Sequence, residues 1–88
     1  MPRSAITFAD LVERANLTQR TIAVVLNKRE ATVSDWVRNA RYPNLTFAEI
    51  LQLQLLLSCT LEELSLCFDN FDTEDARRRI EERMRLME

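Results

Sequence analysis

Glycine and histidine are both absent from this 88-residue chain, and cysteine and proline occur only twice each. Without glycine, the chain cannot form the Gly-rich loops that cradle nucleotide phosphates. Without histidine, and with Cys59 and Cys67 at a spacing that fits no CxxC motif, a zinc site would lack ligands. No nucleophile and base stand at an identifiable spacing. We therefore expect neither an enzyme nor a bound metal or cofactor.

Long apolar runs are also missing. None approaches the ~20 residues that are needed to cross a bilayer, and residues 1–4 lack the apolar core of a secretory signal. We expect a single cytoplasmic domain without membrane contact, and its 47% of hydrophobic residues are enough for a helical core. The two cysteines are then interpreted as small buried side chains, and redox sensing is the alternative.

The net charge of −2 hides an uneven distribution. Residues 1–44 carry seven basic and four acidic groups, a net +3, whereas residues 45–88 carry five basic and ten acidic groups, a net −5. A basic half of this kind suits phosphate binding. The acidic half is expected to face away from a nucleic acid.

Apolar residues recur with helical periodicity, and no long segment alternates with period two, so we expect only helices. Side chains that can cap a helix N-terminus stand at Thr7, Thr18, Thr46 and Thr60. The predicted helices lie near residues 7–15, 18–26, 30–38, 46–57, 60–68 and 73–87, the third beginning at Arg29 or Glu30 and the sixth at Asp72 or Thr73. The predicted core draws on Phe8, Leu11, Ala15, Leu17, Ile22, Ala23, Leu26, Val33, Trp36, Ile50, Leu53, Leu57, Leu61, Leu64 and Phe68.

Residues 17–43, LTQRTIAVVLNKREATVSDWVRNARYP, match a pattern of about a dozen fixed positions: Leu17-Thr18-Gln19, Ile22-Ala23, Leu26-Asn27, Thr32-Val33-Ser34, Trp36, Arg41 and Pro43. The segment resembles the helix-turn-helix of the lambda-repressor and Cro family, the XRE-like regulators. The resemblance implies an all-α fold, a compact five-helix lambda-repressor-like DNA-binding domain over residues 1–71, with an additional C-terminal helix over 72–88. It also implies that Trp36 packs in the core rather than stacking on a base.

The family usually places glycine where a helix ends in a left-handed residue. Asn27 stands at that place after the second helix and Asn39 after the third, and asparagine is the next most tolerant residue there. We predict a positive φ at both. Ser58 replaces a third family glycine, between the fourth and fifth helices.

The resemblance assigns DNA contacts to the start of the second helix and the exposed face of the third. Gln19 would bind a phosphate or orient a neighbour, an arginine at Arg29 can reach a guanine bidentately, and Thr32 would face the groove or turn inward. The candidate DNA-binding residues are Gln19, Arg20, Lys28, Arg29, Glu30, Thr32, Ser34, Asp35, Arg38 and Arg41.

Some positions depart from the family pattern. Glu30 and Asp35 would face DNA phosphates; they could accept from cytosine N4, reject wrong sequences, or pair with Arg29 and Arg38. Val12 and Val37 stand where many relatives carry an Arg–Glu pair, so an apolar contact is expected to replace a salt bridge. Val24, Val25 and Leu55 are apolar where relatives carry charge, which indicates a thicker core or an interface.

The C-terminal helix has the thin apolar stripe Ala76, Ile80, Met84 and Met87, and it must pack on its own domain or on a second subunit to be stable. We expect a homodimer formed through the C-terminal half. The predicted function is that of a sequence-specific transcriptional regulator of the repressor type, from a bacterium or phage, which binds double-stranded DNA at an operator. The alternative is a protein-interaction or antitoxin-like module that keeps the fold but binds DNA weakly or not at all.

Overall fold

The computed structural model describes residues 6–87, and it contains six α-helices and no strand within that range. The predicted all-α class is confirmed, and each helix begins within one residue of its predicted start. Residues 1–4, whose sequence lacks the apolar core of a secretory signal, lie outside the described part. The helices are α1 (Phe8–Arg14), α2 (Gln19–Leu26), α3 (Glu30–Val37), α4 (Phe47–Leu57), α5 (Leu61–Asp69) and α6 (Thr73–Arg85).

The helix starts follow from side-chain caps. Thr7, Thr46 and Thr60 each accept a hydrogen bond from the backbone N–H three residues on, and an acidic side chain at that position bonds back to the cap. Thr18 caps α2 in the same way but without the return bond. Each cap satisfies N–H groups that the first turn leaves without a partner. Asp72, which was one of two alternatives, caps α6.

Five residues between helices have a left-handed backbone, and none is glycine. The predictions for Asn27 and Asn39 are confirmed, with φ of 55° and 57°. Ser58 adopts the same conformation, with φ of 51°. Asn16 and Asn70, which the family pattern did not single out, complete the set at 56° and 51°. At most of the helix ends, asparagine thus supplies the left-handed residue that is usually glycine in other proteins.

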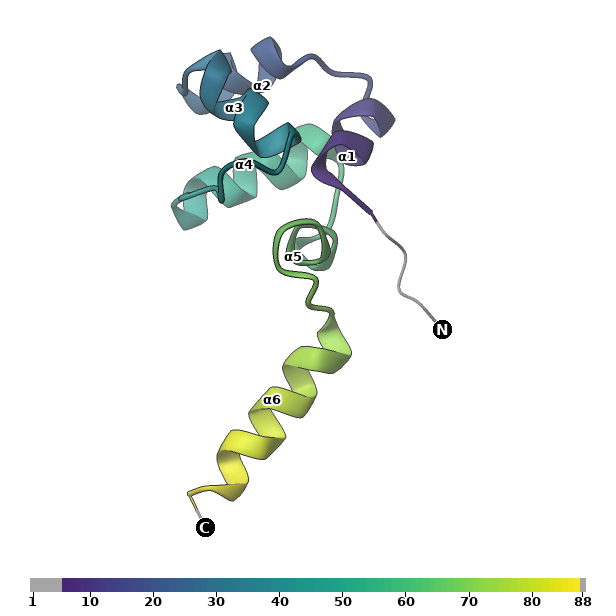
Figure 1. Cartoon of the computed structure of the whole chain (residues 1–88), viewed down its shortest axis with the longest axis vertical. Helices are drawn as coiled ribbons and strands as arrows, with labels where there is room; N and C mark the ends of the chain where they lie inside the picture. Colours follow the sequence, from purple (N-terminus) through teal and green to yellow (C-terminus); the bar gives the residue numbers. More distant parts are fainter. Residues whose placement is uncertain (1–5, 88) are drawn as a thin grey trace.

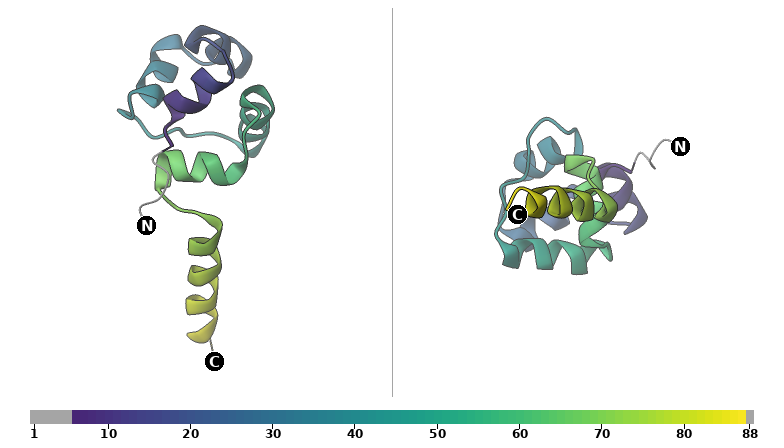
Figure 2. Two further views of the ribbon diagram at one scale, coloured as in Figure 1. Left: turned by 90° about the vertical axis from the view of Figure 1, so that its right-hand side faces the viewer. Right: turned by 90° about the horizontal axis from the view of Figure 1, so that it is seen from below.

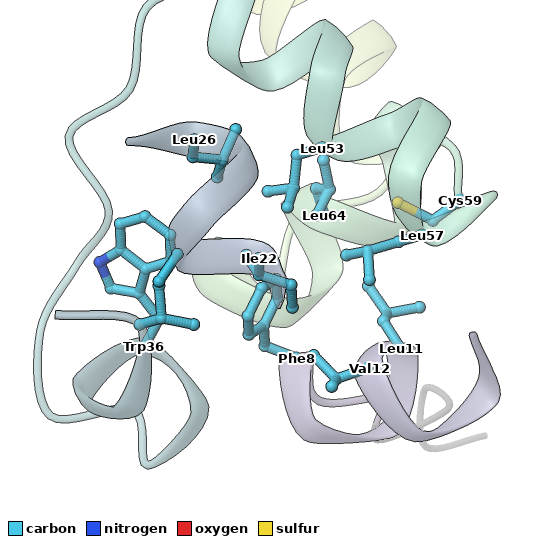
Figure 3. Packing of buried hydrophobic residues seen from close by; sticks show 12 residues of the cluster. Phe8, Leu11, Val12, Ile22, Leu26, Trp36, Leu53, Leu57, Cys59 and Leu64 are labelled. Carbon is cyan, nitrogen blue, oxygen red and sulfur yellow. The ribbon is translucent and has the colours of Figure 1, made fainter. Parts of the chain in front are cut away.

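The core lies among α1 to α5, with Phe8, Leu11, Ile22, Trp36 and Leu53 pointing toward one another (Figure 3). Trp36 is only 2% exposed and meets the Phe8 ring edge-on, with 6.3 Å between centroids, so its predicted core position is confirmed. The buried hydrophobic residues are Phe8, Leu11, Val12, Ile22, Ala23, Leu26, Val33, Trp36, Leu53, Leu57, Cys59 and Leu64.

The predicted core was wrong at Leu61, which is the first residue of α5 and is 58% exposed. Four further predicted residues are half-buried and pack against the core from its edge: Ala15, Leu17, Ile50 and Phe68.

Cys59 is buried and Cys67 half-buried, and both are free thiols. Burial raises the pKa of both thiols, that of Cys67 to about 11, which makes the thiolate needed for redox chemistry scarce at neutral pH.

A bidentate salt bridge joins α1 to α5. Arg14 donates from Nη1 to Glu63 Oε2 at 2.6 Å and from Nη2 to Glu63 Oε1 at 3.1 Å. Glu63 also receives the Thr60 backbone N–H as part of its capping box. The Arg14 guanidinium, followed by this backbone bond, lowers the pKa of Glu63 from its usual 4.5 to about 2.

Acid is therefore expected to weaken the fold through Glu63. Its folded pKa lies below its unfolded value, so its stabilising contribution is complete above about pH 4.5 and is lost as the pH falls toward 2. Glu63→Gln should lower stability at neutral pH and flatten the dependence of the melting temperature on pH in that window. Thermal unfolding from pH 2 to 7 measures this, with Glu13→Gln as the control; an unchanged profile for Glu63→Gln would contradict the prediction.

The last helix stands apart from the others. α6 extends away from the body formed by α1 to α5 (Figures 1 and 2), and the molecule measures 49 × 30 × 23 Å. No residue of α6 is buried. Its Glu74 pairs with Arg77 and its Asp75 with Arg78. The structure therefore does not show α6 packed on its own domain, which was one of the two expectations for this helix.

The most apolar helices are α4 and α5. Taken singly, no helix within residues 6–87 is long and apolar enough to span a membrane. Together α4 and α5 would reach that length and composition, but the chain bends by 104° between them. In this structure they supply Leu53, Leu57 and Leu64 to the core.

Candidate nucleic-acid interface

α2 and α3 are consecutive helices joined by a short turn, residues 27–29, and together they form one structural unit. The left-handed Asn27 ends α2, and the Lys28 N–H closes the turn on the Ala23 carbonyl at 2.8 Å. Val33 and Trp36 are buried, so the inner face of α3 is held against the core. Because side chains three and four apart share a helix face, the opposite face of α3 is turned outward.

The candidate residues fall into two groups around this unit. On α3 and its flanks, Arg29, Glu30, Arg38 and Arg41 are exposed, and Thr32, Ser34 and Asp35 are half-buried. At the start of α2, Gln19 is half-buried and Arg20 exposed. Glu30 lies in the first turn of α3, where its carboxylate complements the positive end of the helix dipole.

Asp35 lies between two arginines. Its Oδ1 accepts a short hydrogen bond from Arg38 Nη2, and its Oδ2 lies 3.8 Å from Arg41 Nε. The pairing of Asp35 with Arg38, one of the roles considered for this carboxylate, is therefore confirmed. The three side chains together carry a net charge of +1. The carboxylate thus positions two guanidinium groups, whose side chains remain 66% and 61% exposed, at the end of α3.

Lys28 has a partner within the chain. Its Nζ lies 2.9 Å from Oε2 of Glu49, in the first turn of α4. The Thr46 backbone N–H, followed by Lys28, lowers the pKa of Glu49. This ion pair connects the turn between α2 and α3 to α4, a structural role that the sequence pattern did not indicate.

Val12 and Val37 line one shallow depression between α1 and α3, together with Leu17 and Gln19. Val12 is buried and Val37 is half-buried against the core. Both valine side chains therefore lie on the same depression, beside the polar residues Glu13, Asn16 and Thr18. Gln19 lines the same depression, so the start of α2 lies beside Val37 of α3.

Tyr42 was not anticipated from the sequence. Its hydroxyl donates to Asp69 Oδ2 at 2.7 Å, and its ring meets Phe68 edge-on at 6.2 Å. The bond to Asp69 is the main cause of the raised pKa of Tyr42. This contact ties the segment that follows Arg41 to α5, and only the folded structure could reveal it because its members lie 27 residues apart.

No family model, curated protein or solved structure matches this chain. What the site can do therefore rests on its own geometry and charge. Within the described residues, no group of three or more histidine, cysteine or acidic side chains is arranged to hold a metal ion. The residues that flank α3 offer a ligand exposed guanidinium groups, and α3 itself offers short polar side chains and the Glu30 carboxylate. Guanidinium and short polar groups bind phosphates and base edges.

Proposed function

We propose that the chain is a sequence-specific DNA-binding transcriptional regulator of the lambda-repressor and Cro type. Residues 17–43 form the helix-turn-helix of a domain over residues 1–71, and α3 enters the major groove of double-stranded DNA. The protein acts by occupying an operator as a homodimer, and residues 72–88 serve the pairing of its subunits.

One observation carries this proposal: the outward face of α3 ends in two exposed arginines, Arg38 and Arg41, held side by side by Asp35. A free carboxylate on this face would repel phosphates, but here the two guanidinium groups outweigh it. Arg29 marks the other end of α3 and Arg20 the start of α2, so exposed cations flank the helix at both ends. Phosphate contacts on both sides of a helix are what position it in the groove.

Affinity for mixed-sequence duplex DNA, measured at several salt concentrations, tests the proposal. A DNA-binding domain should show a logarithmic slope that is strongly negative, because each neutralised phosphate contributes about −0.9. Arg41→Ala should reduce the size of this slope by about 0.9 for each bound chain. If no binding is detected even at low salt, the proposal is wrong.

A second candidate is a protein-interaction or antitoxin-like module. It is favoured by the apolar row Phe47, Leu51 and Leu55, which lies exposed along α4. Rows of this kind on a soluble surface mark contact sites for proteins. If the protein is folded but shows no salt-dependent DNA binding in the same measurement, this second function is favoured over the first.

A further inference from the structure

A groove of about 480 Å³ opens between the segment after α3, the helix α4 and the helix α5. Most of its wall is apolar, Leu61 stands exposed at its rim, and the carboxylate of Asp69 lies at its edge. We name it the α4–α5 groove, and its lining includes Tyr42, Leu45, Ile50, Leu61, Phe68 and Asp69. α6 leads away from this part of the molecule instead of covering it (Figure 1).

α6 carries the complementary feature, an apolar stripe with nothing packed on it. Ile80, Met84 and Met87 are 57%, 62% and 87% exposed, and Ala76 continues the row toward the start of the helix. A helix of this length is marginal in water without a packing partner. We therefore expect the stripe to pack against an apolar surface.

The direction of α6 is held by contacts at its base, so it does not fold back onto its own groove. Ser65 Oγ donates to the Phe71 carbonyl at 2.6 Å, and the Thr73 N–H donates to Glu62 Oε2 at 2.8 Å. The Arg79 guanidinium lies 5.5 Å from the centre of the Phe71 ring. Folding α6 back would break the two hydrogen bonds that Ser65 and Glu62 of α5 form with the start of this segment.

The charges of the two surfaces are opposite. Asp69 is the acidic residue among those that line the groove, and none of them is basic. Glu49 and Glu63, also on α4 and α5, are paired with Lys28 and Arg14. Residues 77–87 contain five arginines and two glutamates, a net +3. A second copy of this chain thus offers an apolar stripe flanked by positive charge to a groove with an acidic edge, and such complementarity favours the encounter and fixes its orientation.

We propose that α6 of each chain docks in the α4–α5 groove of a second copy, so that two chains exchange their C-terminal helices and form a homodimer. A pair of α6 helices alone would be a weaker interface, since four side chains at about 60–120 Å² each remain below the ~800 Å² per partner of a stable complex. Reciprocal exchange adds the groove wall to the stripe, and does so twice. This assembly rests on the pairing through residues 72–88 in the proposed function and specifies how it occurs, but it can be tested without DNA.

Sedimentation velocity of the full chain over a range of concentrations tests the exchange. The wild type should approach twice the mass of its 10.3 kDa chain. Leu61→Glu places a charge at the groove and should weaken self-association by at least about 10-fold. The matched control is Leu55→Glu, at a leucine that is 74% exposed on α4 outside the groove. A monomeric wild type, an unaffected Leu61→Glu, or a loss of association in Leu55→Glu alone would each overturn the proposal.

A mixing experiment separates exchange from misfolding. Ile80→Asp disables the α6 stripe but leaves the groove intact, whereas Leu61→Glu does the reverse, and both positions are exposed in the single chain. Each variant alone should be monomeric, and their mixture should regain part of the dimer, because one intact α6 meets one intact groove. Unfolded chains or a simple α6–α6 pair would show no such recovery, and a mixture that stays monomeric overturns the exchange.

Discussion

Replacing Trp36 by alanine is expected to lower the free energy of unfolding by about 3–5 kcal/mol. The indole is 2% exposed and closes the core between α3 and α1, where its edge-on contact with Phe8 adds to its buried area. A domain of this size has a total stability of roughly 5–15 kcal/mol. The variant should therefore lose a large share of this stability, and urea denaturation followed by circular dichroism measures the loss.

Trp36→Phe is the matched control for this experiment. Within the described residues the buried Nε1 of Trp36 has no hydrogen-bond acceptor, so removing its N–H breaks no bond. The cost should come from the smaller ring volume alone and be clearly smaller than that of alanine. If alanine cost less than about 1 kcal/mol, the assignment of Trp36 to the core would be untenable.

Replacing Arg38 and Arg41 together by alanine is expected to weaken DNA binding roughly 50- to 100-fold at about 0.1 M salt for each bound chain. Both guanidinium groups are exposed at the end of α3, and each phosphate that they no longer neutralise retains about one counterion. Removing both also leaves the Asp35 carboxylate without the partners that neutralise it. Fluorescence anisotropy with a labelled duplex measures the change in affinity, and the melting temperature shows whether the fold is retained.

Asp35→Asn changes the charge of the same cluster in the opposite direction. It removes the carboxylate but keeps the side-chain shape, so the two arginines gain freedom to reach phosphates. Binding should become several-fold tighter and its dependence on salt steeper. Equal affinities for wild type, Asp35→Asn and the double arginine variant would show that DNA does not touch this end of α3.

Local features were predictable from the sequence because their causes are local. Thr7, Thr46 and Thr60 cap helices through bonds that span three residues, and Asn27 and Asn39 end helices as the absence of glycine requires. The burial of most core positions followed from helical spacing. These signals lie within one or two turns of chain, where residue type nearly decides conformation.

Contacts between distant elements were not predictable in the same way. Periodicity placed Leu61 in the core, but the angle at which α5 meets α4 turns that side chain outward. Lys28 was expected to bind DNA, and its ion pair with Glu49 depends on how α4 packs beneath the turn. Among the candidate residues, only the Asp35 and Arg38 pair could be foreseen, because they are three residues apart on one helix.

The glycine-free helix ends have a consequence for the unfolded chain. A residue with a Cβ atom is strained in the left-handed conformation, by roughly 1–2 kcal/mol for most residues and by less for asparagine. Glycine would relieve that strain, but its greater freedom before folding would cost about 0.4–1 kcal/mol at each position. At Asn16, Asn27, Asn39 and Asn70 part of this strain is offset by a narrower unfolded ensemble, whereas at Ser58 the strain exceeds that gain.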